Sequence, residues 1–172
     1  MERDKMATID FAFRNEIIKS DIGSTLTYCY QCATCSGACP VAQVTEGRYN
    51  PRRLILDALL GLKEKIFGPE NAFNIWGCTV CDTCDEVCPQ KVELTEIFTI
   101  LKNKSIERGE APEYYTIQAS TVLENGKAIP MQPAIERRRD QLGLPKIMEP
   151  DVAEVKKLLE VTKLPEKLPK KE

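Results

Sequence analysis

A cysteine–proline motif occurs twice in this chain, and the two copies are offset by 49 residues. Each copy reads Cys-x2-Cys-x2-Cys-x3-Cys-Pro, and Thr34 in the first copy recurs as Thr83 in the second. The motif positions are Cys29, Cys32, Cys35, Cys39 and Pro40 in the first copy, and Cys78, Cys81, Cys84, Cys88 and Pro89 in the second. A constant offset over all these positions indicates an internal repeat with one local structure.

The residue types restrict the metal chemistry that the repeat can support. The chain has 172 residues, with 8 cysteines and no histidine. Rieske-type ligation, mixed Cys/His zinc sites and a histidine base are therefore excluded. Thiolate is left as the main metal ligand.

The spacing itself favours iron–sulfur cubanes. Three cysteines on a tight loop can bind three corners of one [4Fe–4S] cluster, and in two-cluster ferredoxins the fourth, followed by proline, ligates the other cluster. Applied to both copies, this rule predicts one cluster on Cys29, Cys32, Cys35 and Cys88, and a second on Cys78, Cys81, Cys84 and Cys39. Such crossed ligation would hold the two halves together and keep two redox centres close to each other.

Eight cysteines have two other common uses. Two zinc knots of four thiolates are an alternative, but zinc needs only Cys-x2-Cys pairs and does not explain the third cysteine or the Cys-Pro step. A disulfide scaffold is disfavoured because residues 1–13 lack an apolar run of signal-peptide length. The doubled motif thus favours two [4Fe–4S] clusters.

Helical signals surround the cysteines. Asn50 and Pro51 are a typical helix start, and an apolar stripe of helical period follows from Leu54 to Ile66, with Gly68 and Pro69 expected to end the helix. A second amphipathic helix is predicted around residues 94–101 and a first one near residues 10–20, which would bury Phe13, Ile17 and Ile18.

Beyond residue 109 the chain is divided by prolines. This segment holds 7 of the 11 prolines in the protein. Short helices are predicted near residues 113–125, 134–142 and 151–162, and a frayed lysine-rich end at 167–172. With no strand alternation, the predicted fold is mainly α. The expected parts are an N-terminal helical arm (1–28), a two-cluster α-helical ferredoxin domain (29–109) and a helical extension (110–172) that docks a partner or wraps its own core.

Charge and apolar runs bear on location and partners. The formal charge is −2 and the pI about 5.5, so nothing indicates a basic nucleic-acid footprint. The longest apolar stretch, residues 54–62, is far too short to span a bilayer. A cytoplasmic protein without nucleic-acid or membrane partners is expected.

Aromatic residues lie beside or near the cysteines, and substrate motifs are missing. Tyr28, Tyr30 and Trp76 are interpreted as core aromatics rather than shields of the clusters. All eight cysteines are used by the clusters, and there is no Gly-rich dinucleotide loop or P-loop. No catalytic residue is therefore predicted in this chain, nor any cofactor-binding residue beyond the cluster ligands.

The length between the two motifs separates ferredoxin architectures. Here 38 residues lie between Cys39 and Cys78 and carry a predicted helix, whereas small βαβ ferredoxins have a shorter connection with strands. The chain resembles the α-helical ferredoxin domain family, and within it the small iron–sulfur subunit of the soluble heterodisulfide reductase of methanogenic archaea. The resemblance is carried by residues 15–40, 50–53 and 75–89.

The resemblance implies an electron relay within an oxidoreductase complex. In that family a flavin-containing subunit bifurcates electron pairs from hydrogenase or formate dehydrogenase. One electron goes to ferredoxin, and the other passes through the iron–sulfur subunit to the catalytic subunit, which reduces the CoM-S-S-CoB heterodisulfide. These subunits are the expected partners. A freely diffusing two-cluster ferredoxin, or the iron–sulfur subunit of another anaerobic oxidoreductase, is the alternative.

Overall fold

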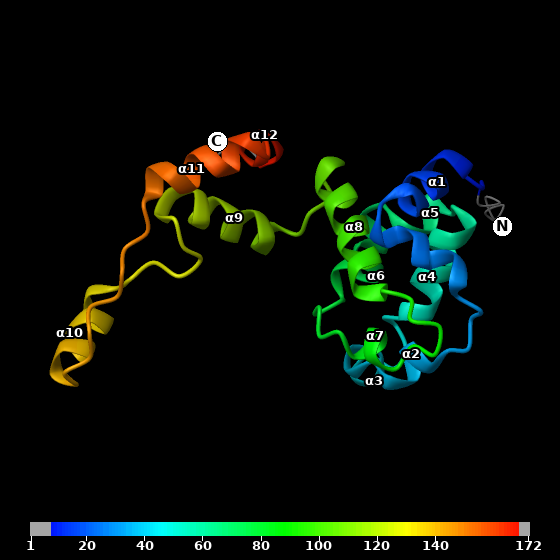
Figure 1. Cartoon of the computed structure of the whole chain (residues 1–172), viewed down its shortest axis with the longest axis horizontal. Helices are drawn as coiled ribbons and strands as arrows, with labels where there is room; N and C mark the ends of the chain where they lie inside the picture. The colour runs from blue at the N-terminus through cyan, green and yellow to red at the C-terminus, as the bar shows by residue number, and fades with distance from the viewer. Residues whose placement is uncertain (1–7, 169–172) are drawn as a thin grey trace. The chain divides into compact units, whose positions relative to one another are not determined.

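The structure, a computed structural model, describes residues 8–168 and contains helices but no strand in that range. The predicted mainly α class is confirmed. The chain divides into two compact units, Met1–Ala111 and Pro112–Glu172 (Figure 1).

The first unit is built from short helices around one apolar core. Its elements are α1 (Phe11–Lys19), η1 (Ile22–Tyr28), α2 (Thr34–Ala38), α3 (Pro40–Val44), α4 (Pro51–Leu60), α5 (Lys63–Ile66), η2 (Pro69–Asn71), α6 (Ala72–Trp76), α7 (Thr83–Glu86) and α8 (Leu94–Glu107). Helix α1 packs against η1 and α4, while α8 packs against η1, α6 and α7. Figure 1 shows α2, α3 and α7 together at one end of this unit. The cysteine motifs therefore share one end of the helical core.

Helix α1 begins and packs largely as the sequence indicates. The Asp10 carboxylate caps it by accepting a hydrogen bond from the Phe13 N–H at 2.9 Å. Phe13 and Ile17 are buried as predicted, whereas Ile18 is only half-buried. The apolar face of α1 is thus narrower than its sequence suggests.

Helix α4 starts as predicted but ends earlier. Asn50 is its N-cap and Pro51 its first residue. The prediction of one helix running to Gly68 is wrong, because Gly61 adopts a left-handed conformation (φ +70°) and ends α4 after Leu60. A Cβ on Gly61 would lie 2.4 Å from the Asp10 carbonyl oxygen, so close packing against the start of α1 also requires glycine.

Helix α8 supplies much of the core. Ile97, Phe98 and Leu101 are fully buried, and the helix ends beside Gly109, which has a positive φ. The stripe predicted around residues 94–101 is confirmed and extends one more turn.

The second unit contains α9 (Glu113–Asn125), α10 (Pro133–Gln141), α11 (Val152–Val161) and α12 (Leu164–Lys167). The three helices predicted here are found within one residue at each end. Helix α9 packs against α11, yet no residue between 112 and 168 is fully buried. Of the lysine-rich end, Lys167 lies in α12, and residues 169–172 lie outside the described range.

Candidate metal centre

The sequence repeat is also a repeat of backbone conformation. Gln31 and Ala33, which lie between the first three cysteines, have positive φ angles of 64° and 69°. Their equivalents Val80 and Asp82 have φ angles of 54° and 57°. A left-handed conformation costs a non-glycine residue about 1–2 kcal/mol. Because the same strain recurs at both copies, it belongs to the shape of the cysteine loop.

The first cysteine hollow is formed by the loop of the first motif and the last cysteine of the second motif. It is lined by Cys29, Cys32, Cys35 and Cys88, together with Tyr30 and Arg52. The side-chain amide of Gln31 donates to Cys29 Sγ at 3.2 Å, and the Val92 N–H donates to Cys88 Sγ at 3.3 Å. Three neighbouring cysteines and one distant cysteine therefore face one space.

The second cysteine hollow has the reciprocal composition. It is lined by Cys78, Cys81, Cys84 and Cys39, with Tyr49 and Thr95 beside them. The Ala42 N–H lies 3.5 Å from Cys39 Sγ, and the Val80 N–H lies 3.5 Å from Cys78 Sγ. Helices α2 and α7 pack against each other, so the two hollows are formed across one contact.

Both hollows suit a group larger than a single ion. All eight cysteines are free thiols. Among residues 8–168, no three Cys, Asp or Glu side chains converge tightly enough to hold one metal ion. In each hollow four cysteines line one space, and two of their sulfurs receive an N–H donor, which is the environment of a cubane with thiolate ligands.

The second and third cysteines of each motif have thiol pKa values that shift in the same direction in both copies. The hydroxyl groups of Thr34 and Thr83 lie 3.3 Å and 3.4 Å from the sulfurs of exposed Cys32 and Cys81, and they lower the pKa of each thiol. Burial raises the pKa of Cys35 and raises that of Cys84 to about 12. Metal binding must therefore displace protons from Cys35 and Cys84.

A hydrogen-bond chain connects the first motif to α4. The Gln31 side chain that donates to Cys29 accepts from Arg52 Nη1 at 3.4 Å. The Arg52 N–H donates to Ser36 Oγ at 3.1 Å, and the Ser36 hydroxyl donates to Asn50 Oδ1 at 2.7 Å. The helix cap of α4 thus also positions the loop that carries Cys35.

The three aromatic residues near the cysteines differ in their burial. Trp76 is buried, and its Nε1–H donates to Ser105 Oγ at 3.1 Å, which confirms it as a core residue. For Tyr28 and Tyr30 the core interpretation is wrong, because they are 58 % and 57 % exposed. Tyrosine tolerates such positions since its hydroxyl can be hydrated.

Two residues in or beside the second hollow were not predicted from the sequence. Lys102 is buried, donates from Nζ to the Cys78 carbonyl oxygen at 2.8 Å and lies 5.7 Å from the Trp76 ring centroid. Burial lowers the pKa of Lys102. Lys102 lies one turn after Phe98 on the apolar face of α8, and this position could have indicated its burial. Tyr49 lines the same hollow and had no periodic signal.

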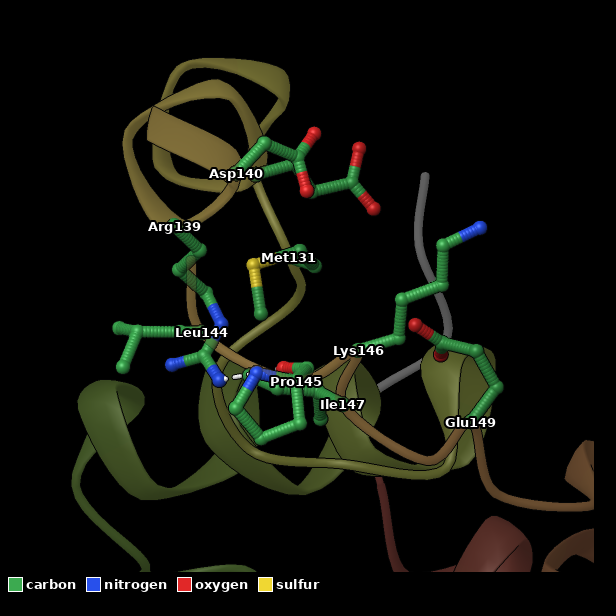
Figure 2. A pocket seen from close by; sticks show the side chains of 9 residues that line it. Met131, Arg139, Asp140, Leu144, Pro145, Lys146, Ile147 and Glu149 are labelled. Atoms are coloured by element: carbon green, nitrogen blue, oxygen red, sulfur yellow. Dashed lines mark hydrogen bonds between the residues drawn. The ribbon is translucent and has the colours of Figure 1, made fainter. Parts of the chain in front are cut away.

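A further hollow lies in the second unit and has different chemistry. It measures about 280 Å³ and is lined by residues that include Met131, Asp140 and Ile147, with no cysteine among them. The Arg139 guanidinium donates to the Pro145 carbonyl oxygen at 2.8 Å across one side of it (Figure 2). This hollow therefore lacks the thiolate ligands that a [4Fe–4S] cluster needs.

Comparison with known proteins agrees with this geometry. Residues 25–92 match the family described as 4Fe-4S dicluster domain, and this range includes all eight cysteines. An iron–sulfur subunit of the CoB–CoM heterodisulfide reductase from Methanocaldococcus jannaschii is 34 % identical, over 92 % of this chain and 89 % of the relative. The chain belongs to the family of heterodisulfide reductase iron–sulfur subunits.

Other relatives in this family have similar identities. The corresponding subunit of the H2:CoB–CoM heterodisulfide, ferredoxin reductase of Methanothermobacter marburgensis is 33 % identical over 81 % of this chain and 72 % of its own length. Its counterpart in the H2/formate:CoB–CoM heterodisulfide, ferredoxin reductase of Methanococcus maripaludis is 33 % identical over 81 % of this chain and 77 % of its own length.

Family membership establishes the cofactors and the general role. The chain binds two [4Fe–4S] clusters and serves electron transfer as a subunit of a CoB–CoM heterodisulfide reductase complex. None of the helices within residues 8–168 has both the length and the apolar character needed to cross a membrane.

Proposed function

We propose that this iron–sulfur subunit relays single electrons from a flavin-containing, bifurcating subunit to a catalytic subunit that reduces the CoM-S-S-CoB heterodisulfide. The observation that carries the proposal is the pair of four-cysteine hollows formed across the α2–α7 contact. When bound there, [4Fe–4S] clusters supply one-electron redox chemistry. The chain positions the two centres and leaves substrate chemistry to its partners.

The proposed ligand sets are crossed between the motifs. Cys88 would complete the set of Cys29, Cys32 and Cys35, and Cys39 would complete the set of Cys78, Cys81 and Cys84. The lining of each hollow supports this assignment. Each fourth cysteine also receives a backbone N–H donor, as a thiolate ligand of a cluster commonly does.

Paired ligand variants test the crossing. Cys88→Ser is expected to alter the same electron paramagnetic resonance signal as Cys32→Ser, although Cys88 belongs to the other motif. Cys39→Ser should alter the signal that Cys81→Ser alters. If Cys88→Ser instead matches Cys81→Ser, each motif binds its own cluster and the crossed sets are wrong.

The proposed partners are based on the family and on the names of two relatives. The names of two relatives include ferredoxin reductase activity together with H2, or with H2 and formate. We infer that hydrogenase or formate dehydrogenase supplies electrons to the larger complex here too. Anaerobic affinity purification tests this: the flavin-containing and catalytic subunits should co-purify in stoichiometric amounts, and a lone monomer would favour a diffusing ferredoxin instead.

We further propose that residues 29–109 form the two-cluster domain and that residues 110–172 dock the catalytic subunit. Large apolar side chains are exposed throughout the extension, including Ile117, Ile129, Leu142, Met148 and Leu158. Truncation after Gly109 should abolish co-purification with the catalytic subunit while both clusters are retained. A matched control, Leu158→Ala with Ile117→Ala in the full chain, should weaken binding without removing residues; unchanged binding by both proteins would refute docking.

A further inference from the structure

Tyr49 occupies an unusual position for a tyrosine. It lies between α3 and α4, is 1 % exposed and lines the second cysteine hollow beside Cys39, Cys78 and Cys84. Its sequence position gives it no part in the predicted ligand sets. A buried phenol therefore lies directly against the sulfurs of the second centre.

The Tyr49 hydroxyl is buried without a hydrogen bond. Within residues 8–168 it is the one buried side-chain nitrogen or oxygen atom that lacks a protein partner. Leaving a buried hydroxyl unpaired costs about 1–3 kcal/mol. Phenylalanine would fill the same space without that cost, so the hydroxyl needs a partner that the surrounding nitrogen and oxygen atoms do not provide.

The surroundings of the hydroxyl identify this partner as sulfur. Burial, and then the negative charge of Cys78, raise the pKa of Tyr49, with smaller contributions from Cys39 and Cys84. A phenol is protonated at neutral pH without any such shift, so the hydroxyl can donate. Cys78 lines the hollow with Tyr49 and directly follows Gly77, whose added Cβ would lie 2.9 Å from the Tyr49 ring, which makes the Cys78 sulfur the acceptor that the packing favours.

The ring is held firmly enough to aim the hydroxyl. The Tyr49 N–H donates to Thr45 Oγ1 at 3.2 Å, and Phe73 packs edge-on with its ring centroid 6.3 Å away. On another side, a Cβ added to Gly77 would lie 2.9 Å from Tyr49 Cδ2. The fold thus fixes the orientation of the hydroxyl independently of the redox state of the centre.

We propose that the Tyr49 hydroxyl donates a hydrogen bond to the Cys78 sulfur and thereby raises the reduction potential of the second centre. The proposal rests on the proposed ligand sets. Reduction adds negative charge to the sulfurs, and a hydrogen bond to a charged acceptor is stronger than one to a neutral acceptor. The donor therefore stabilises the reduced state more than the oxidised state.

The first hollow offers a matched comparison. Tyr30 lines it beside Cys32, but Tyr30 is 57 % exposed. If the Tyr30 hydroxyl is removed, water can donate to the sulfur in its place, whereas water does not reach the site of the buried Tyr49 hydroxyl. Removing the Tyr30 hydroxyl should therefore shift the first centre less than removing the Tyr49 hydroxyl shifts the second.

Redox titration of the anaerobically purified complex, followed by electron paramagnetic resonance, tests the proposal. The variants are Tyr49→Phe, Tyr30→Phe and, as a control outside both hollows, Tyr28→Phe; Cys81→Ser and Cys32→Ser assign the two signals. Tyr49→Phe should shift the second potential to a more negative value and leave the first unchanged. An unchanged second potential overturns the role of Tyr49. A wrong ligand set is recognised separately, because Cys39→Ser and Cys81→Ser would then remove different signals.

A second measurement decides the question if Tyr49→Phe does not load both clusters. Biosynthetic replacement of the 5 tyrosines by 3-fluorotyrosine keeps each ring and makes each hydroxyl a stronger donor. The second potential should then become more positive, and by more than the first, because only the Tyr49 hydroxyl is buried against its cluster site. If it does not move, the hydrogen bond does not tune this centre.

Discussion

Replacing Asn50 by alanine tests whether one capping residue supports both a helix and a cysteine loop. Its side-chain oxygen accepts hydrogen bonds from the Arg53 N–H at 3.0 Å and from the Ser36 hydroxyl at 2.7 Å. Loss of an N-cap costs about 1 kcal/mol. Loss of the second hydrogen bond costs about another 1 kcal/mol.

Asn50→Ala is therefore expected to destabilise the protein by about 2 kcal/mol, which lowers the unfolding midpoint of a chain this long by about 4–8 °C. Ser36→Ala retains the cap but removes two hydrogen bonds, the one to Asn50 and the one from the Arg52 N–H, so it should give a shift of similar size. The measurement is an anaerobic thermal scan of cluster-loaded protein at one fixed heating rate, with iron content determined before the scan. Asn50→Ala should also load less iron, because Ser36 neighbours Cys35.

The matched control is Asp151→Ala in the second unit. Asp151 caps α11 by accepting from the Ala153 and Glu154 N–H groups at 2.9 Å and 3.2 Å, and it lies outside both cysteine motifs. This variant should lose the cap energy alone and leave iron content unchanged. If Asn50→Ala lowers the midpoint no more than Asp151→Ala does, the link from the cap to the first motif contributes nothing.

Three further changes have definite expected outcomes. Phe98→Ala empties a fully buried site and should destabilise the protein by about 3–5 kcal/mol in the same thermal scan. Gly23→Ala should lower the midpoint, because its Cβ would lie 1.9 Å from a backbone carbonyl oxygen, whereas Gly37→Ala, with no atom within 4 Å, should leave it unchanged or slightly raised. Burial raises the pKa of Asp57 above its unfolded value, so the ionised carboxylate costs stability at neutral pH. Asp57→Asn should raise the midpoint at pH 7, and the gain should vanish as the pH falls towards about 4; a gain independent of pH would contradict this reasoning.

Much of the local structure was predictable because its signals are local. The cap at Asn50 and the stripe of α8 depend on residues within a few positions of one another. The early end of α4 was not predicted because the apolar period continues past Gly61, and the period alone does not report a left-handed residue. The backbone contact between Gly61 and Asp10, which joins distant parts of the chain, makes that break necessary.

The sequence by itself determined the chemistry of the centre: eight thiolates, no histidine, and a spacing that suits two cubanes. This information is contained in residue type and short spacing, so it needs no knowledge of the fold. Only the tertiary structure decided that Tyr49 lies buried in the lining of the second hollow and that Lys102 lies buried against the Cys78 backbone, while Tyr28 and Tyr30 are exposed. Burial is the sum of contacts between segments far apart in the chain, and those contacts exist only once the helices have packed.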